Sequence, residues 1–462
     1  MVSQFRSFDR IAEKMRLEGI SEIAINNFGY YYDRLQSGQS DLISEASIRP
    51  VESVPDADSF EDDKALMAAG EAALSRTVML KLNGGLGTSM GLNQTKSLLV
   101  VKNGQTMLDL MAKQAIKHEI PLIFMNSFST QEDTLAALAR YPELKYDDIP
   151  QDFLQNKVPK ITCTDLTPVQ WPDNPSLEWC PPGHGDIYVA LITSGMADKL
   201  MAAGYRYVFM SNSDNLGAVV NISILGYFVA NHLPLMMEVS DRNRADRKGG
   251  HLAHLLDGRL ILRESSQCPA EDMEHFEDIG RHRFFNTNNL WLDLVALKQV
   301  MEKNNYMTRL PMITNKKTVD PRDDGSTPVY QLETAMGSGL GMFENSGAVR
   351  VSRSRFSPIK TTEDLLSVRS DAYVVTEDHR IILDPGRDVP PFVQLDGTYY
   401  RLIDDLEARF PYGAPSLRNC RSLTINGDVH FGQHVVLEGD VRFDSLSDTP
   451  MRIDDHTHIV GE

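Results

Sequence analysis

The sequence predicts an α/β fold built on a largely parallel sheet, followed by a C-terminal parallel, left-handed β-helix. Two observations lead to this prediction. Apolar runs of strand length alternate with helical segments through the middle of the chain, and apolar residues recur every six positions near its end. Alternating strands and helices favour a parallel sheet covered by helices on both faces. A six-residue apolar period is typical of the coils of a parallel β-helix.

The alternating elements can be assigned from apolar runs and helical periodicity. A first strand at 78–82 ends in Asn83-Gly84-Gly85, and further strands are expected at 121–125, 207–210 and 235–239. Helices are expected at 108–118, 131–139, 187–203 and 222–230. Because ligands bind at the carboxyl ends of parallel strands, the polar loops after 82 and 210 mark the expected site.

Three regions follow from these patterns. Residues 1–70 are expected to form an N-terminal helical segment, which ends in an acidic, solvated connector at 55–63. Residues 71–378 form the α/β domain, and residues 379–462 form a C-terminal domain that contains the repeat. In the repeat, Ile425, Phe431, Leu437 and Phe443 are six apart, as are Val429, Val435 and Val441. Chance alternation in an ordinary sheet is the alternative explanation for this period.

Composition limits the possible functions. The 462 residues include 46 Lys and Arg against 64 Asp and Glu, a net charge of −18, which argues against nucleic acid as a partner. A local positive pocket for a small polyanion remains compatible with this charge. No segment is apolar enough to predict a membrane span or an export signal. The four cysteines are widely spaced and His251 and His254 form no convincing zinc set, so free thiols and a cytoplasmic location are expected.

The loop Leu82-Asn-Gly-Gly-Leu-Gly-Thr-Ser-Met-Gly91 carries the strongest chemical signal. Glycines after a strand let backbone N–H groups approach a phosphate chain. A Walker loop would need Gly-Lys-Ser/Thr, but Thr95 precedes Lys96, and a dinucleotide fingerprint would need glycine where Met90 stands. The loop is therefore neither a Walker loop nor a dinucleotide-binding loop. The alternative to a phosphate-binding role is a tight turn that serves only the structure.

This loop and six later motifs, in order, resemble the eukaryotic-type UTP–glucose-1-phosphate uridylyltransferases. The resemblance covers about residues 77 to 370, and the repeat tail matches more loosely. It implies a Rossmann-like nucleotidyltransferase core with a mixed, mostly parallel sheet. The later motifs are Pro181-Pro-Gly-His-Gly-Asp-Ile-Tyr188, Ser211-Asn-Ser-Asp-Asn-Leu-Gly217, Lys248-Gly-Gly250, Phe285-Asn-Thr-Asn-Asn-Leu-Trp291, Gln331-Leu-Glu-Thr334 and Arg355-Phe-Ser-Pro-Ile-Lys-Thr-Thr362.

The resemblance also implies which residues bind the nucleotide. The uridine nucleotide would lie on Leu82, Asn83, Gly84 and Gly85, largely through the backbone. Gln155 matches the position that reads the uracil edge, and an amide suits an imide because it offers both a donor and an acceptor. Gly183 and His184 would lie between the base and the sugar phosphate. An ordinary loop glutamine and a structural histidine are the alternatives at these positions.

The remaining site residues concern the sugar and the reaction. Lys96 would lie against the triphosphate, and Lys360, which follows Arg353 and Arg355 in a cluster of positive charge, would contact phosphate as a second catalytic lysine. Asp214 would bind the nucleotide and hold Mg²⁺, the implied cofactor. The sugar hydroxyls would be read by Asn212, Glu264, Asn286 and Asn288.

The implied activity is Mg²⁺-dependent transfer of uridylyl from UTP to α-D-glucose 1-phosphate, which yields UDP-glucose and pyrophosphate. One alternative is the same reaction with another acceptor, such as galactose 1-phosphate or an N-acetylhexosamine phosphate. A second alternative is a non-catalytic protein that senses uridine nucleotides. Asn93-Gln94-Thr95 departs from the Lys-Gly-Pro that many relatives carry before the lysine. Exposed strand edges in the short β-helix suggest self-association into a homo-oligomer.

Overall fold

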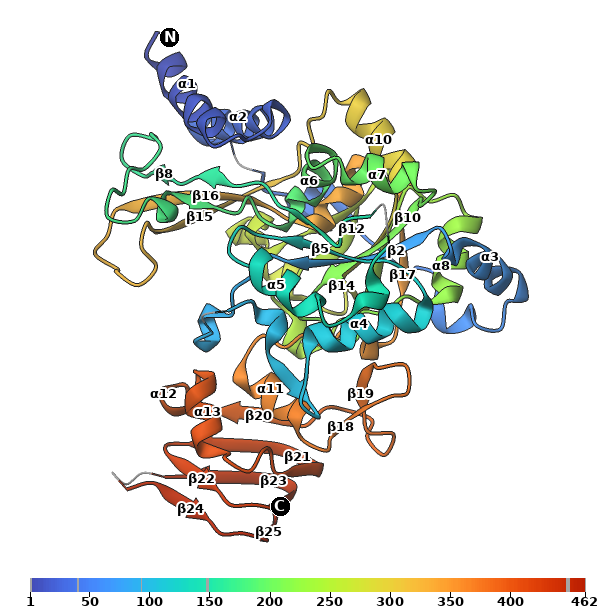
Figure 1. The fold of residues 1–462 in the computed structure, drawn as a ribbon, viewed down its shortest axis with the longest axis vertical. Coiled ribbons are helices and arrows are strands. Elements are labelled where there is room, and N and C mark those ends of the chain that lie inside the picture. The colour runs from blue at the N-terminus through green and yellow to red at the C-terminus, as the bar shows by residue number, and fades with distance from the viewer. Residues whose placement is uncertain (1, 40, 93, 147–148, 446–448, 462) are drawn as a thin grey trace.

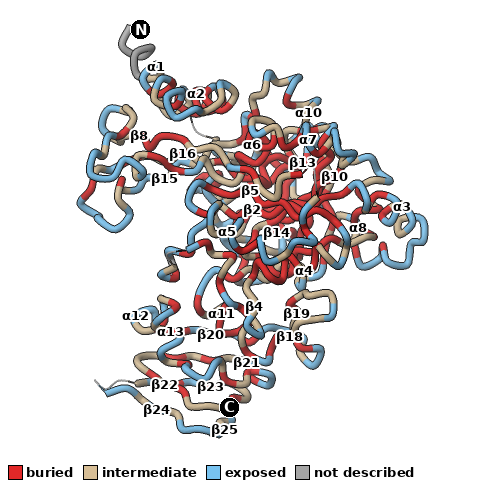
Figure 2. Tube along the Cα trace, in the orientation of Figure 1, coloured by how far each residue is buried: buried red, intermediate tan, exposed pale blue. Residues whose placement is uncertain are grey.

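The computed structural model describes residues 2–39, 41–92, 94–146, 149–445 and 449–461. A central sheet with helices on both faces forms the middle of the molecule, with two N-terminal helices at one end and C-terminal strands at the other (Figure 1). Buried residues concentrate in the central sheet and in the helices against it (Figure 2). The repeat prediction extends to residue 448, and its last three residues lie outside the described part of the chain, as does Asn93.

The central sheet is mixed. Its parallel part runs β10–β2–β5–β6, and β14 is antiparallel to both β10 and β11. The predicted α/β class with a mixed sheet is confirmed. The strands in order are β1 (Ile48–Pro50), β12 (His251–Leu255), β14 (Phe284–Asp293), β10 (Tyr207–Asn212), β2 (Thr77–Asn83), β5 (Leu122–Asn126) and β6 (Asp152–Leu154). In addition, β13 (Leu260–Arg263) pairs with β12, β11 (Leu235–Asp241) pairs with β14, and β17 (Gly347–Arg350) pairs with β11.

Side chains alternate between the two faces of this sheet. Met79 and Phe209 pack on one face with α4 and α8, whereas Leu80 and Met210 pack on the other with α6 and α7. Every residue of β2 is buried, which explains why its sequence is mostly apolar instead of alternating between apolar and polar residues. The helices of this region are α3 (Lys64–Leu74), α4 (Met107–His118), α5 (Gln131–Leu138), α6 (Ile187–Thr193), α7 (Met196–Ala202), α8 (Ile222–Ala230), α9 (Met273–Glu277) and α10 (Leu294–Lys303).

Two sequence expectations in this region are corrected. The single helix expected at 187–203 is two helices, because Gly195 adopts φ +72° between α6 and α7 and interrupts the helical hydrogen bonds. The acidic stretch 55–63, expected to be a solvated connector, makes specific contacts with the α/β core. The carboxylate of Asp56 accepts a 2.9 Å hydrogen bond from Arg350, and the buried Phe60 ring stacks on Tyr227 with centroids 4.5 Å apart.

The N-terminal part combines helices with small antiparallel sheets. Helices α1 (Val2–Leu17) and α2 (Glu22–Ser37) share an apolar cluster with Trp179 and Leu332. The chain then returns to the core, because β1 pairs with β12 and α3 packs on α8. The small sheets there are β15 (Met312–Thr318) with β16 (Pro328–Thr334) and β8 (Ile161–Thr162), and β7 (Val158–Pro159) with β9 (Trp179–Cys180). A further antiparallel pair, β3 (Val100–Lys102) with β4 (Gln105–Thr106), lies elsewhere, against α11 (Thr362–Arg369).

The C-terminal part contains two sets of parallel strands, β20–β21–β23–β25 and β22–β24. All of the six-residue apolar positions are buried there, and the Phe431 ring stacks on Phe410 at 4.6 Å. Its elements are α11 (Thr362–Arg369), β18 (Tyr373–Val375), β19 (Ile381–Leu383), β20 (Phe392–Leu395), α12 (Gly397–Tyr400), α13 (Ile403–Arg409), β21 (Ser416–Asn426), β22 (Val429–Phe431), β23 (Val436–Asp444), β24 (Met451–Ile453) and β25 (His458–Val460). Among the described helices, none has the length and apolar character needed to cross a bilayer.

Candidate active site

The carboxyl ends of two neighbouring parallel strands define the site. Leu82 of β2 pairs in register with Asn212 of β10, so the loops that follow the two strands leave the sheet side by side. The amide N–H of Ser213 donates to the carbonyl of Leu82 at 3.0 Å, which ties these loops together. The two polar loops singled out in the sequence therefore meet, as expected for the ligand edge of such a sheet.

The glycine loop is shaped around Gln155. A Cβ on Gly84 would lie 2.8 Å from Nε2 of Gln155, so a side chain there would displace this amide from its position against the loop. The backbone N–H of Gln155 donates to the carbonyl of Asn126 at 2.8 Å, which fixes the residue at the end of β6. Gly85 is exposed and its carbonyl accepts from the backbone of Lys96.

The side chain of Asn83, at the start of this loop, has a structural role. Its Nδ2 donates to Oδ1 of Asn126 and to Oγ1 of Thr134, both at 2.9 Å, and the residue is buried. The side chain therefore holds β2 against β5 and α5. Only its backbone is directed to the glycine loop.

His184 has a defined tautomer. Its Nδ1 accepts a 2.8 Å hydrogen bond from the backbone N–H of Met336, so the neutral ring carries its proton on Nε2. Burial lowers the pKa of His184 to about 4, and the positive charge of Lys360 contributes to this lowering. Gly183 starts this turn, and the preceding Pro182 accepts a 2.9 Å hydrogen bond from the N–H of Thr334. His184 is therefore a neutral hydrogen-bond donor at neutral pH.

Asp186 links the two segments predicted to contact the base, a role that sequence reasoning missed although the residue lies in a quoted motif. Its carboxylate accepts from the backbone N–H of Asn156 at 2.7 Å and from Nδ2 of Asn156 at 2.9 Å. The residue is buried, and burial raises its pKa to about 7 in spite of these two hydrogen bonds. Asp186 thus joins the loop of Gln155 to the turn of His184.

Lys96 and Asp214 form an ion pair between the loops. Nζ of Lys96 lies 2.7 Å from Oδ2 of Asp214, and the two side chains are 17% and 19% exposed. The other carboxylate oxygen, Oδ1 of Asp214, is buried and has no hydrogen-bond partner among the described residues. A buried oxygen with free lone pairs fits a divalent cation, and Mg²⁺ commonly binds one protein carboxylate together with substrate phosphates. Clusters of three or more His, Cys, Asp or Glu that could hold a metal are absent from the part of the chain that the structure describes.

Lys360 approaches the same site from the segment before α11. Its side chain is exposed, and its charge acts on the pKa of both His184 and Glu264, which places it near both residues. The positive cluster expected from Arg353 and Arg355 is neutralised. Arg353 binds both oxygens of Asp246, at 2.6 and 2.8 Å, and Arg355 binds Glu238. Lys360 is thus the residue of this predicted cluster whose charge remains directed at the site.

The side chain of Asn215 fastens the Lys360 segment to the Asp214 loop. Its Nδ2 donates to the carbonyl of Arg355 at 3.1 Å, and its Oδ1 accepts from the N–H of Ser357 at 2.9 Å. The N–H of Ile359 also donates to the carbonyl of Asp214 at 3.1 Å. The relative positions of Asp214 and Lys360 are therefore set by direct hydrogen bonds.

A buried polar network supports these loops from below, and sequence reasoning did not find it. Glu238 is fully buried and accepts hydrogen bonds from Arg355, Asn289 and Trp291. Lys81, also fully buried, donates to Oγ of Ser211 and to the carbonyl of Ala218, both at 2.7 Å. Burial lowers the pKa of Lys81 to about 7, and the nearby charge of Arg355 contributes.

The predicted sugar residues also converge. Nδ2 of Asn286 donates to Oδ1 of Asn288 at 2.9 Å, and the N–H of Asn288 donates back to Oδ1 of Asn286 at 2.8 Å. Burial raises the pKa of Glu264, while a hydrogen bond with Asn286 and the charge of Lys360 partly offset this effect. Asn212 is partly exposed at the end of β10. The structure thus brings Glu264, Asn286 and Lys360 together.

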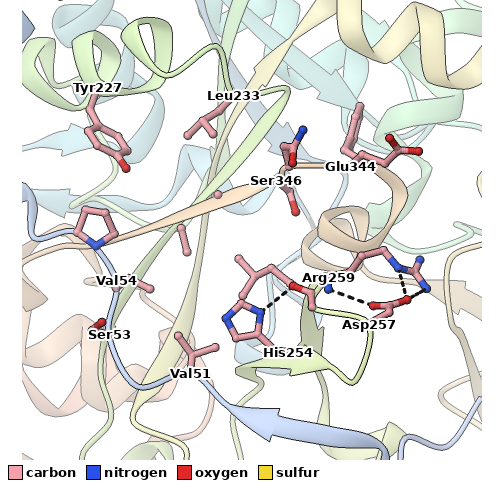
Figure 3. Close-up of a pocket in the computed structure, with 17 residues that line it drawn as sticks. Val51, Ser53, Val54, Tyr227, Leu233, His254, Asp257, Arg259, Glu344 and Ser346 are labelled. Atoms are coloured by element: carbon pink, nitrogen blue, oxygen red, sulfur yellow. Dashed lines mark hydrogen bonds and ion pairs between the residues drawn. The ribbon is translucent and has the colours of Figure 1, made fainter.

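A cavity of about 620 Å³ lies elsewhere, at the amino ends of β11 and β17 (Figure 3). Its polar lining is partly paired internally, because Arg259 binds Asp257 and Nδ1 of His254 lies 3.1 Å from the carbonyl of Gly258. The residues that line it include none of those predicted for the site. Convergent polar groups, rather than this cavity, identify the candidate active site.

Comparison with known proteins adds a family match. A family model described as UTP–glucose-1-phosphate uridylyltransferase matches residues 25–438. A potato (Solanum tuberosum) UTP–glucose-1-phosphate uridylyltransferase is 39% identical over 398 residues, 84% of this chain and 81% of the relative. The Saccharomyces cerevisiae enzyme of the same name is 40% identical over 376 residues, 80% of this chain and 74% of the relative.

Solved structures match over nearly the whole chain. A mutant of UDP-glucose pyrophosphorylase from Leishmania major, in complex with UDP-glucose, has a TM-score of 0.91 and 41% identity, and the match covers 99% of this chain and 98% of that one. A Trypanosoma brucei structure named UDP-glucose phosphorylase has a TM-score of 0.88 and 44% identity, covering 99% and 100%.

Proposed function

Because the chain belongs to the UTP–glucose-1-phosphate uridylyltransferase family, we propose that the loops after β2 and β10 form the site where it binds and joins its substrates. The chain is a nucleotidyltransferase that converts UTP and glucose 1-phosphate into UDP-glucose and pyrophosphate. The observation that carries the site assignment is the Lys96–Asp214 pair at 2.7 Å, since a cation and a carboxylate then lie together at the expected ligand edge of the sheet.

The uridine half would bind along the glycine loop. The backbone of Leu82, Gly84 and Gly85 would lie under the nucleotide, and the Gln155 amide would pair with the uracil edge. The close contact between Gln155 and Gly84 supports this arrangement, because it aims the amide over the loop. The Nε2–H of His184 is a donor suited to a phosphate or ribose oxygen.

The sugar half would bind beside Glu264. Asn212, Asn286 and Asn288 offer amide donors and acceptors for hydroxyl groups, and Glu264 offers acceptors. Lys360 would contact the sugar phosphate, since it lies near both His184 and Glu264. Two substrates would then meet between Lys96 and Lys360.

The chemistry needs no protein nucleophile. A phosphate oxygen of glucose 1-phosphate bonds to the α-phosphorus of UTP, the bond between that phosphorus and the bridging oxygen to the β-phosphate breaks, and its electron pair leaves with pyrophosphate. The protein's contribution is to align the two phosphates and to neutralise their charge. Lys96 holds positive charge at the α-phosphate, and Asp214 would hold Mg²⁺, which when bound neutralises phosphate oxygens.

The C-terminal region adds a separate proposal. Residues 379–462 would form a domain whose two sets of parallel strands are sides of a left-handed β-helix, and the edge strand β25 would pair with a second copy of the chain. The exposed Val460 on that strand supports this idea. Light scattering on the wild type and Val460→Lys tests it. Equal masses would exclude pairing through this edge.

The proposed function is tested by pyrophosphate release from the purified protein with UTP and Mg²⁺. Glucose 1-phosphate should support turnover best among glucose, galactose and N-acetylglucosamine 1-phosphates. UTP should be preferred over CTP. No release with any sugar phosphate would leave only a uridine-nucleotide sensor, and preference for another sugar would reassign the acceptor.

A further inference from the structure

A buried charged cluster lies behind the proposed sugar residues, and the linker between α2 and β1 supplies its central carboxylate. Glu45 starts a short 3₁₀ helix, η1 (Glu45–Ser47), and its side chain is 10% exposed. One carboxylate oxygen lies 2.7 Å from Nη1 of Arg263, and the other lies 2.6 Å from Nε of Arg281. Both oxygens lie within 3.2 Å of Nε2 of His282. Burial acts to raise the pKa of Glu45, but its partners, Arg281 above all, hold it below the ordinary value.

This cluster is attached directly to the segment that carries Glu264. Arg263, whose side chain is completely buried, is the residue immediately before Glu264 at the end of β13. The linker makes a second contact there, because the N–H of Ile43 donates to the carbonyl of Gln267 at 2.7 Å. Oε1 of Gln267 in turn accepts from the backbone N–H of Glu264 at 2.7 Å. Glu264 is therefore held through its own backbone and through its neighbour.

The cluster also reaches Glu264 from the neighbouring strand. The His282 ring stacks on His251 with centroids 3.8 Å apart, and His251 pairs in register with Arg263. Gly250 precedes His251, and a Cβ on Gly250 would lie 2.5 Å from Oε2 of Glu264. The carbonyl of Gly250 also accepts a 3.1 Å hydrogen bond from the N–H of Asn286. A shift of β12 or β13 would consequently move both Glu264 and Asn286.

The position of the buried Arg263 guanidinium depends on the negative charge of Glu45. Arg263 has no exposed surface, and its other polar contacts are Asp272 at 3.5 Å and Sγ of Cys268 at 3.3 Å. Removing the Glu45 charge would leave a buried guanidinium with these longer contacts. A buried cation that loses its partner is strongly unfavourable, so the chain around Arg263 would rearrange to reach another acceptor or water.

We propose that Glu45 is a positioning residue for the acceptor sugar, which acts by fixing Arg263 and thereby the carboxylate of Glu264. The inference rests on the proposed function, because it takes Glu264 as a sugar-hydroxyl ligand. It assigns a role in sugar recognition to the N-terminal linker, which lies outside the motifs of the site. The residues proposed for the UTP half lie on other elements, namely the loops after β2 and β10 and the turn of His184.

The test is a double-mutant cycle with steady-state kinetics for both substrates on the full chain. Glu45→Gln should raise KM for glucose 1-phosphate about tenfold while KM for UTP changes by less than about twofold. In a Glu264→Gln background the same substitution should change the sugar KM by less than about twofold, because residues that act in series are not additive. Glu22→Gln, which removes an exposed carboxylate paired with Arg16, is the control and should change neither constant.

The outcomes distinguish the positioning role of Glu45 from the sugar-ligand role of Glu264. Equal changes in both KM values, or full additivity with Glu264→Gln, would overturn the positioning role and leave Glu264 as a sugar ligand. A Glu264→Gln variant with an unchanged sugar KM would overturn both the ligand assignment and the inference. If Glu45→Gln does not fold, Glu45→Asp replaces it, since it keeps the charge but shortens its reach. A sugar-selective rise in KM is expected again, and its absence would overturn the role.

Discussion

Nζ of Lys96 lies 2.7 Å from Oδ2 of Asp214, and this ion pair joins the loop after β2 to the loop after β10. Each residue limits the position of the other, because both side chains are mostly enclosed. Oδ1 of Asp214 has no hydrogen-bond partner within the described part of the chain. The pair thus sets the spacing between the cation proposed to contact phosphate and the carboxylate proposed to hold Mg²⁺.

Lys96→Met should lower kcat by about two to three orders of magnitude, comparable to the loss of a well-placed electrostatic group of about 3–4 kcal/mol. The KM for UTP should change less, because the charge acts mainly as the transition state forms. Steady-state pyrophosphate release measures both constants. Lys298→Met removes an exposed lysine paired with Asp198 and serves as the control. A Lys96→Met enzyme with normal kcat would remove Lys96 from the reaction.

Asp214→Asn keeps the size of the side chain but removes the charge on the proposed metal ligand. The Mg²⁺ concentration for half-maximal activity should rise and the rate at saturation should fall, because a neutral amide binds a divalent cation weakly. A Mg²⁺ titration of activity measures the change. Saturation at the wild-type concentration with full rate would make the carboxylate purely a partner for Lys96.

Gln155→Ala should relax base selection and leave chemistry largely intact. Loss of the amide leaves polar groups of the bound base unpaired, at a cost of about 1–3 kcal/mol. The ratio of kcat/KM for UTP to that for CTP should therefore fall about tenfold. Gln170→Ala, at an exposed position, is the matched control. An unchanged ratio in a folded variant would move base recognition to other residues.

Asp186 should make folding stability depend on pH in an unusual direction. Its folded pKa, about 7, lies above the value of an unfolded aspartate, so the folded state binds the extra proton between about pH 4 and 7. Its contribution to stability is fully present below about pH 4 and is lost as pH rises through about 7, at up to about 1.4 kcal/mol per pH unit. Urea unfolding of the wild type and Asp186→Asn over this range measures the difference. Parallel pH profiles would show that Asp186 is ionised throughout.

The fold could be predicted where local pattern decides structure. The run at 78–82 is apolar apart from Lys81 because β2 is buried on both faces, and the glycines that follow it mark the loop against which Gln155 lies. The break at Gly195 was missed because the apolar periodicity of α6 continues into α7.

The buried charges could not be predicted because their partners are far apart in sequence. Arg355 looks like part of a basic surface cluster until Glu238, which lies 117 positions earlier, is placed beside it. Glu45 and Arg263 are separated by 218 positions, and neither belongs to one of the motifs recognised in the sequence. Charged residues are normally exposed, so sequence alone predicts an exposed side chain at each of these four positions, Arg355, Glu238, Glu45 and Arg263.

The most direct test of the central claim is the stereochemical course of uridylyl transfer at the α-phosphorus. UTP with a single configuration at a sulfur-substituted α-phosphate reacts with glucose 1-phosphate, and phosphorus NMR identifies the configuration of the product. Direct in-line attack between substrates that lie between Lys96 and Lys360 predicts inversion, because one displacement occurs without a protein nucleophile. Retention would require two displacements through a covalent uridylyl-protein intermediate and would contradict the account.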